Sequence, residues 1–263
     1  MTLCITRTND VNEKSHDGVL TVTVNRPEKR NPLSLGVLER LREIFSGQAY
    51  NPSLRLAIVT GAGDRAFASG GDIVELSAVR SPEDAKALSE HGRRALDAIR
   101  RFPVPVIARL NGIALGGGAE LAVACDLRFA AAGASIGFIH SRLGISPPWG
   151  GGVDLMRLVG YSTGLRLLAK EEVLTADAAQ RCGLIDGFAT ADQNFDVAFD
   201  EFLGKMKQHP PQVMRAIKAL SYRERVCDRA ALDESETNHF IEVWTHEDHW
   251  NALAAVSARE GSK

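Results

Sequence analysis

Two glycine-rich turns contain the residues of this sequence whose types and spacing could support chemistry. The first turn spans Phe67–Asp72 and the second spans Ala114–Glu120. Each follows a run typical of a β-strand and leads into a run typical of a helix, so several backbone N–H groups lack partners and point outward. Two such turns that converge would form an oxyanion hole, which stabilises a carbonyl oxygen as it gains negative charge.

An acidic residue, Glu120, comes directly after the glycines of the second turn. From that position its carboxylate could exchange a proton with whatever the oxyanion hole binds. A single glycine run is more often a plain turn, and either run alone would indicate nothing more. The two turns together with this acid indicate a site that stabilises an anion and transfers a proton.

Three further motifs do not fit their sequence context. Gly61–Ala66 matches the dinucleotide-binding pattern G-x-G-x-x-A, but a loop follows it instead of a helix. Gly133–Gly137 has the G-x-S-x-G spacing of a nucleophile elbow, but the glycines and prolines after it exclude the required helix. His246 and His249 lie in a polar helical stretch without a recognisable set of metal ligands. We therefore expect no nicotinamide, flavin or metal cofactor.

The elements that must position the two turns alternate between strands and helices. Strands are expected at residues 3–8, 18–25, 54–60, 104–110, 126–130 and 135–138. The first two should pair as a hairpin through a turn at residues 9–12. Helices should begin after the capping residues Ser34 and Ser81, and within the glycines at 116–118. This alternation predicts an α/β fold with parallel strands.

Only helical spacing remains from residue 192 onward, interrupted by Pro210 and Pro211. Helices are expected at residues 192–208, 211–225 and 229–257. The sequence thus predicts two regions. Residues 1–191 form the α/β core with the active site, and residues 192–263 form a helical carboxyl-terminal region.

The composition excludes several classes of protein. The 263 residues include 31 Lys and Arg against 33 Asp and Glu, without a basic block, so nucleic acid is not an expected partner. No stretch approaches the ~20 apolar residues of a membrane span, and the amino terminus lacks a signal-peptide pattern. The four cysteines lie far apart, which suits a reducing compartment. A cytoplasmic protein without a membrane partner is expected.

Four segments resemble the crotonase (enoyl-CoA hydratase/isomerase) superfamily, namely residues 25–34, 67–73, 111–121 and 125–128. The resemblance covers almost the whole chain. It implies a crotonase-like spiral of ββα turns with a helical carboxyl-terminal region used in oligomerisation, in a homotrimer or a hexamer built from two trimers. It also implies a lyase that acts on acyl-CoA thioesters in fatty-acid metabolism. Coenzyme A is then part of the substrate, and no separate cofactor is expected.

The same resemblance assigns roles to residues of the two turns. It implies that the backbone N–H groups of Gly71 and Gly117 hold the thioester oxygen. Ser69 would offer its backbone to the adenine of coenzyme A, and Asp72 is expected beside the substrate.

Basic residues near the amino terminus are the expected contacts of the coenzyme A phosphates. Arg26, Lys29 or Arg30 would fill this role, with a merely solvated charge as the alternative for each. Many relatives also help to bind coenzyme A through a carboxyl-terminal Glu-Lys-Arg run. Residues 250–259 stand in place of that run here.

Two departures from the family pattern fall on the machinery for hydration. A typical hydratase uses two glutamates to hold and ionise the water that adds to the double bond. Glu120 matches the first, but His140 aligns with the second. Pro148 aligns with a glycine whose N–H contacts the same water, and proline has no N–H to donate. Trp149 beside it could form an apolar wall, with core filling as the alternative.

Further segments resemble the ethylmalonyl-CoA decarboxylase branch of the superfamily, namely residues 138–140, 144–151, 210–218 and 243–244. The leading hypothesis is therefore decarboxylation of a short 2-alkylmalonyl-CoA, with ethylmalonyl-CoA and methylmalonyl-CoA as examples. Glu120 or His140, directly or through water, would return a proton to the enolate. Two alternatives remain: an enoyl-CoA hydratase of the β-oxidation type, with His140 in place of the second glutamate, and a non-catalytic crotonase-fold scaffold.

Overall fold

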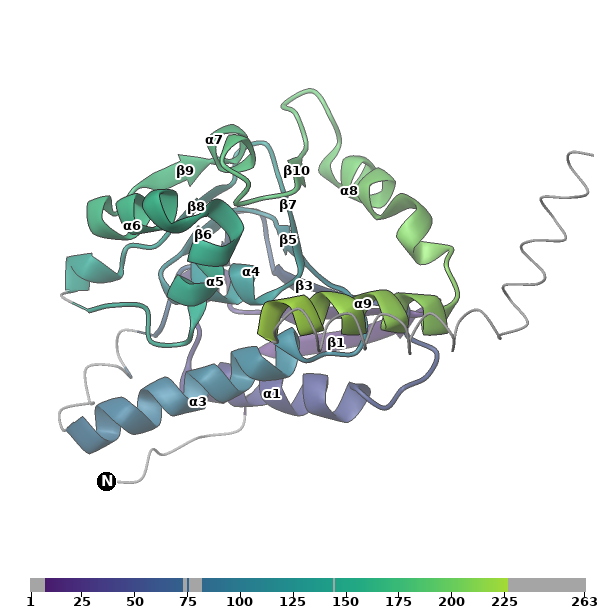
Figure 1. Ribbon diagram of the computed structural model, residues 1–263, viewed down its shortest axis with the longest axis horizontal. Helices are drawn as coiled ribbons and strands as arrows, with labels where there is room; N and C mark the ends of the chain where they lie inside the picture. Colours follow the sequence, from purple (N-terminus) through teal and green to yellow (C-terminus); the bar gives the residue numbers. More distant parts are fainter. Residues whose placement is uncertain (1–7, 73–74, 76–81, 144, 227–263) are drawn as a thin grey trace, which may run out of the picture.

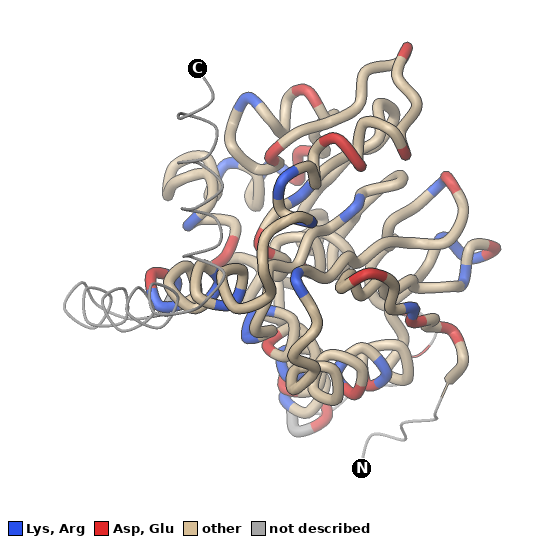
Figure 2. The backbone as a smooth tube through the Cα atoms, turned by 90° about the vertical axis from the view of Figure 1, so that its right-hand side faces the viewer, with Lys and Arg blue, Asp and Glu red and all other residues tan. Residues whose placement is uncertain are grey.

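The computed structural model describes residues 8–72, 75, 82–143 and 145–226. Within these ranges no helix is both long enough and apolar enough to cross a membrane. Basic and acidic residues are interspersed along the described backbone (Figure 2).

The strands form two sheets. The larger sheet has the order β1 (Val11–His16), β2 (Val19–Val24), β3 (Leu56–Gly61), β5 (Val106–Leu110), β7 (Leu127–Ala130) and β10 (Gly187–Phe188). The smaller sheet has the order β4 (Ala66–Ala68), β6 (Ile113–Leu115), β8 (Ser135–Gly137) and β9 (Val173–Thr175). Strand pairs are parallel except for β1 with β2 and β8 with β9.

The chain passes repeatedly from the larger sheet to the smaller one before a helix returns it. The pairs β3–β4, β5–β6 and β7–β8 each place one strand in each sheet. The helices that follow these three pairs are α3 (Pro82–Arg100), α4 (Gly117–Ala124) and α5 (Gly151–Val159). The predicted α/β spiral of ββα turns is confirmed.

Helices cover the sheets on the outside. In Figure 1, α1 (Leu35–Gln48) and α3 lie side by side, and α6 (Tyr161–Lys170) and α7 (Ala176–Arg181) lie at the far end of the molecule from them. The Ser34 hydroxyl accepts a hydrogen bond from the N–H of Val37 at 3.2 Å, so the predicted cap of α1 is confirmed. The predicted cap Ser81 lies outside the described residues.

The amino-terminal hairpin differs from the prediction. Its turn is at Asp17 and Gly18, not at residues 9–12, and β1 pairs with β2 from Val11 to His16. Asp17 has φ +44° and Gly18 has φ +71°, the positive values that a two-residue hairpin turn requires. The strand expected at 3–8 lies almost wholly outside the described residues.

The chain after β10 is helical as far as it is described. It forms α8 (Phe195–Leu203), a 3-10 turn at Gly204–Lys207 and α9 (Pro211–Val226). Two ion pairs attach α9 to the core, from Lys218 to Asp126 and from Arg225 to Asp154. The predicted helix at 229–257 is outside the described residues, and both the boundary at residue 192 and the role in oligomerisation stay predictions.

The spiral brings the start of α4 against β4, where the backbones touch. A methyl group added to Gly118 would lie 2.0 Å from the carbonyl oxygen of Ala68. We expect Gly118→Ala to lower the free energy of unfolding by about 3 kcal/mol, because backbone must move to admit the methyl group. Gly47 near the end of α1 is the matched control, since nothing lies within 4 Å of the same added group. Gly47→Ala should raise stability by about 0.5–1 kcal/mol. Urea unfolding measures both, and equal stability of the two variants would contradict the packing.

Candidate active site

The two glycine-rich turns meet, as the sequence predicted. Gly70 has φ +115° and Gly116 has φ +53°, conformations that side chains rarely adopt. A methyl group on Gly70 would lie 3.3 Å from the carbonyl oxygen of Leu115 and 3.8 Å from the nitrogen of Gly117. The turns therefore approach each other through their backbones.

Gly71 and Gly117, one in each turn, have backbone N–H groups without an acceptor in the described part of the chain. Neighbouring N–H groups are used: that of Asp72 donates to Leu33, and that of Gly116 donates to the carbonyl of Gly137. Within the described part of the chain, neither Gly71 nor Gly117 donates its N–H to any acceptor. Gly117 is the first residue of α4, so its N–H has no partner within the helix. These are the donors expected for the oxyanion hole.

A pocket of about 240 Å³ opens onto these two residues. Most of its lining area is apolar, and its polar side chains are few. The lining residues are Ser69, Gly70, Gly71, Leu88, Gly116, Gly117, Glu120, Ile139, His140, Arg142, Ile145, Pro148 and Trp149. A concave, mainly apolar site with a few convergent polar groups is typical of small-molecule binding.

The carboxylate of Glu120 accepts hydrogen bonds from two backbone N–H groups and contacts His140. Its Oε1 accepts the N–H of Trp149 at 2.9 Å and the N–H of Gly151 at 3.0 Å. Its Oε2 lies 3.1 Å from Nε2 of His140. Glu120 is completely buried and His140 is 7% exposed. The two side chains predicted to move the proton are thus hydrogen-bonded to each other.

The loop that carries Pro148 and Trp149 is fixed to its surroundings. The Ser89 hydroxyl donates to the carbonyl oxygen of Pro148 at 2.8 Å. The Arg100 guanidinium donates to the carbonyl oxygen of Trp149 at 3.0 Å and to Asp154 at 2.8 Å. These contacts place the loop so that its N–H groups point at Glu120.

A family model described as enoyl-CoA hydratase/isomerase matches residues 14–255. The chain belongs to this family. It is 32% identical to the short-chain-enoyl-CoA hydratase of Clostridium acetobutylicum over 94% of each chain. It is 30% identical to the ethylmalonyl-CoA decarboxylase of Bos taurus, over 88% of this chain and 76% of that one. A crystal structure of an enoyl-CoA hydratase from Bacillus anthracis matches with a TM-score of 0.88 at 29% identity, covering 95% of this chain and 97% of that one. The protein is thus an acyl-CoA enzyme of the crotonase superfamily.

Four residues that were expected near the substrate do not line this pocket, namely Arg26, Lys29, Arg30 and Asp72. Arg26 donates to Asp72 at 2.8 Å and lies 3.3 Å from Asp10. Its side chain is only 12% exposed, so it serves to join two segments of the chain. Lys29 lies in the 3-10 turn Pro27–Lys29 and is exposed. Ser69 does line the pocket, and its N–H donates to the carbonyl oxygen of Arg30 at 3.1 Å.

Sequence reasoning missed several lining residues. Ile139 and Arg142 flank His140 in the sequence, which is the signal that could have found them. Leu88 comes from the middle of α3 and carries no local signal. Arg142 lies 3.0 Å from Glu171, and hydrogen bonds from Ser141 and Arg142 lower the pKa of the Glu171 carboxyl.

The rejected motifs have ordinary structures. Gly61–Ala66 leads into strand β4, and Gly133–Gly137 ends in strand β8, so neither opens a helix. Across the described ranges, no group of three or more His, Cys, Asp or Glu residues could hold a metal ion. His246 and His249 lie outside those ranges. Cys125 is buried, and burial raises the pKa of its thiol to about 12, as suits a residue of the core.

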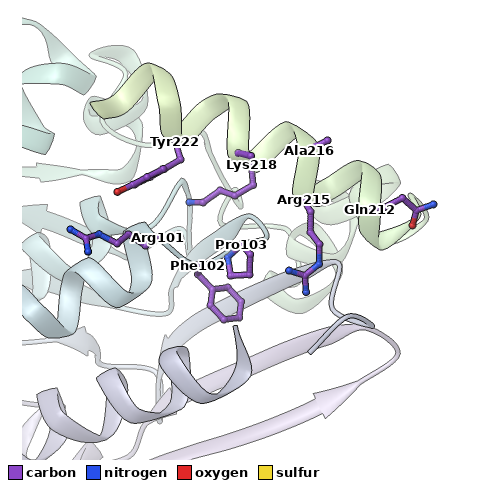
Figure 3. Close-up of a pocket in the computed structure, with 9 residues that line it drawn as sticks. Arg101, Phe102, Pro103, Gln212, Arg215, Ala216, Lys218 and Tyr222 are labelled. Carbon is purple, nitrogen blue, oxygen red and sulfur yellow. The ribbon is translucent and has the colours of Figure 1, made fainter. Parts of the chain in front are cut away.

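A second pocket, of about 320 Å³, lies between α9 and residues 101–103 (Figure 3). Lys218 reaches into it from α9, where it pairs with Asp126, and burial lowers the pKa of its ammonium group. The residues that line it are Arg101, Phe102, Pro103, Gln212, Arg215, Ala216, Lys218, Ala219 and Tyr222. No carboxylate or imidazole is among these lining residues. The first pocket has both, in Glu120 and His140, beside the two glycine turns, so we place the candidate active site there.

Two substitutions of Glu120 separate its chemical role from its structural one. Glu120→Gln keeps an oxygen to accept the N–H groups of Trp149 and Gly151, so the melting temperature should change little. The amide cannot exchange a proton as a carboxylate does, and kcat should fall by about 10² or more. Glu120→Ala should also lose about 1–3 kcal/mol of stability for each buried N–H left unpaired. Wild-type turnover by a folded Glu120→Gln variant would exclude this carboxylate from proton transfer.

Proposed function

We propose that this enzyme decarboxylates a short 2-alkylmalonyl-CoA, such as ethylmalonyl-CoA or methylmalonyl-CoA. One observation carries the proposal. Glu120 is the one carboxylate among the described lining residues of the pocket, and both of its oxygens already accept or share hydrogen bonds with the protein.

That arrangement suits poorly the addition of water to a double bond. A hydratase of this family needs a water held between two carboxylates. The second position is His140, whose Nε2 is directed at Glu120 instead of leaving room for such a water. Pro148 has no N–H, and the N–H groups of Trp149 and Gly151 are taken by Glu120.

Decarboxylation uses the features that are present. The thioester oxygen sits between the N–H groups of Gly71 and Gly117. The bond between Cα and the carboxylate carbon breaks, carbon dioxide leaves, and the electron pair moves into the thioester to form an enolate. The two N–H groups stabilise the enolate oxygen more than the neutral carbonyl, which accelerates this step. Apolar walls at Leu88, Ile145 and Trp149 disfavour the substrate carboxylate relative to neutral carbon dioxide.

The hydrogen-bonded pair of Glu120 and His140 then returns one proton to Cα. The pair lies at the same end of the pocket as Gly117, because Glu120 is three residues further along α4. A proton from solvent restores the pair after product release. One proton is therefore taken up for each carbon dioxide released.

The relatives support two versions of this chemistry. Similarity to the bovine ethylmalonyl-CoA decarboxylase supports the proposal. Similarity to the clostridial short-chain-enoyl-CoA hydratase supports hydration as the second candidate, with His140 in the role of the second glutamate. Both candidates use the same oxyanion hole and the same acid pair, so they are separated by product.

The deciding experiment incubates the purified protein with ethylmalonyl-, methylmalonyl- and crotonyl-CoA. We expect carbon dioxide from one or both malonyl thioesters, at a rate well above that of crotonyl-CoA hydration. In heavy water the acyl-CoA product should carry one deuterium at Cα, which mass spectrometry detects. Fast hydration of crotonyl-CoA, with no carbon dioxide from either malonyl thioester, would overturn the proposal in favour of a hydratase.

A double substitution tests the physical reason for the choice. His140→Glu together with Pro148→Gly supplies the missing carboxylate and the missing N–H. Hydration of crotonyl-CoA should rise and decarboxylation should fall, as followed by absorbance of the enoyl thioester and by release of carbon dioxide. The single variants are the controls and should each give a smaller rise in hydration. If the double variant gains no hydration, these two positions do not decide the reaction.

A further inference from the structure

Trp149 occupies a slot between helices α3 and α4 that two glycines leave open. A methyl group on Gly92 of α3 would lie 2.2 Å from Nε1 of the indole. A methyl group on Gly117 of α4 would lie 2.4 Å from Cζ3 on the other ring. The five-membered ring therefore faces Gly92 and the six-membered ring faces Gly117. Trp149 is only 3% exposed, although it lines the candidate active site.

The slot adjoins the place where the substrate's acyl part must lie. Gly117 supplies one donor to the thioester oxygen in the proposed function, so the six-membered ring stands next to the reacting end. Leu88, one helical turn before Gly92 on α3, lines the same pocket. The indole thus closes the gap between α3 and α4 at the buried side of the pocket.

The indole is held there by its backbone and not by its own polar atom. The N–H of Trp149 donates to Glu120, and its carbonyl oxygen accepts from Arg100. Its Nε1 is buried and has no hydrogen-bond partner within the described part of the chain. The side chain therefore acts through its shape. The backbone contacts fix the Cα position of Trp149, and close packing against Gly92 and Gly117 fixes the ring.

We propose that Trp149 limits the length of the acyl chain that the enzyme accepts. This inference rests on the thioester position given under the proposed function, and it names the substrate class further: a short alkyl substituent fits, and a longer one meets the indole. Removing the indole joins the pocket to the slot between Gly92 and Gly117, which opens a path for a longer chain.

The test measures binding of saturated acyl-CoA thioesters, which undergo neither decarboxylation nor hydration. Dissociation constants for butyryl-, hexanoyl- and octanoyl-CoA are determined by calorimetry. Wild-type affinity should fail to rise beyond butyryl-CoA. In Trp149→Ala and in the milder Trp149→Leu, affinity should rise about fourfold for each added methylene that gains a buried place.

Two further variants separate the wall from general loosening of the core. Phe45→Leu disturbs the edge-to-face contact with Phe102, whose ring centroids are 5.0 Å apart, away from the pocket. It should lower the melting temperature without changing the order of affinities. The methyl group of Gly92→Ala would displace the indole from the slot into the pocket. This variant should therefore bind butyryl-CoA more weakly.

The outcomes distinguish this inference from the proposed reaction. If the affinity of folded Trp149→Leu depends on acyl-chain length as that of the wild type does, Trp149 does not limit chain length. That conclusion holds even if the enzyme releases carbon dioxide. Wild-type affinity that rises steadily to octanoyl-CoA would overturn this role of Trp149 as well, as would a wild type that binds none of the three thioesters. If the variants prefer longer acyl chains than the wild type does but no carbon dioxide is released, the role of Trp149 is supported and the proposed decarboxylation is rejected.

Discussion

The buried carboxylate of Glu120 is the interaction on which the arrangement of the pocket depends. It joins three separate parts of the chain: α4, which carries Glu120; the segment from Trp149 to Gly151, where α5 begins; and His140. Burial of a carboxylate is costly unless hydrogen bonds compensate it, and here backbone N–H groups supply them. The same contacts orient two of the loop's N–H groups, so carboxylate and loop fix each other.

Beside this carboxylate, the glycine turns provide a complementary kind of polarity. In the described part of the chain, the N–H groups of Gly71 and Gly117 have no acceptor, and the backbone directs the partial positive charge that they carry. Glu120 uses the N–H groups of Trp149 and Gly151 instead, so it does not compete with a bound ligand for those of Gly71 and Gly117.

Local signals in the sequence were sufficient for the alternation of strands and helices, and the family resemblance supplied the spiral of ββα turns. Ser34 marks the start of α1, and the second glycine run marks where β6 gives way to α4. The hairpin prediction was wrong because the polar residues at 9–12 resemble a turn, whereas the Asp17-Gly18 pair, a strong turn signal, forms it.

Contacts between residues far apart in the sequence could not be predicted in the same way. Arg26 and Asp72 are 46 positions apart, and no spacing in the sequence indicated that they form an ion pair. Leu88 enters the pocket only because α3 packs beside α4. The place of Trp149 depends on two glycines on different helices, and no spacing in the sequence relates them.

Asp154 forms ion pairs with two arginines that come from different helices. Arg100 reaches it from α3 while also holding the carbonyl oxygen of Trp149, and Arg225 reaches it from the end of α9. The end of α9 and the wall of the pocket are therefore two ion pairs apart. Coupling between binding events is reciprocal. If a partner at α9 shifted these ion pairs and so changed the affinity for ligand, ligand would change the affinity for that partner by the same factor.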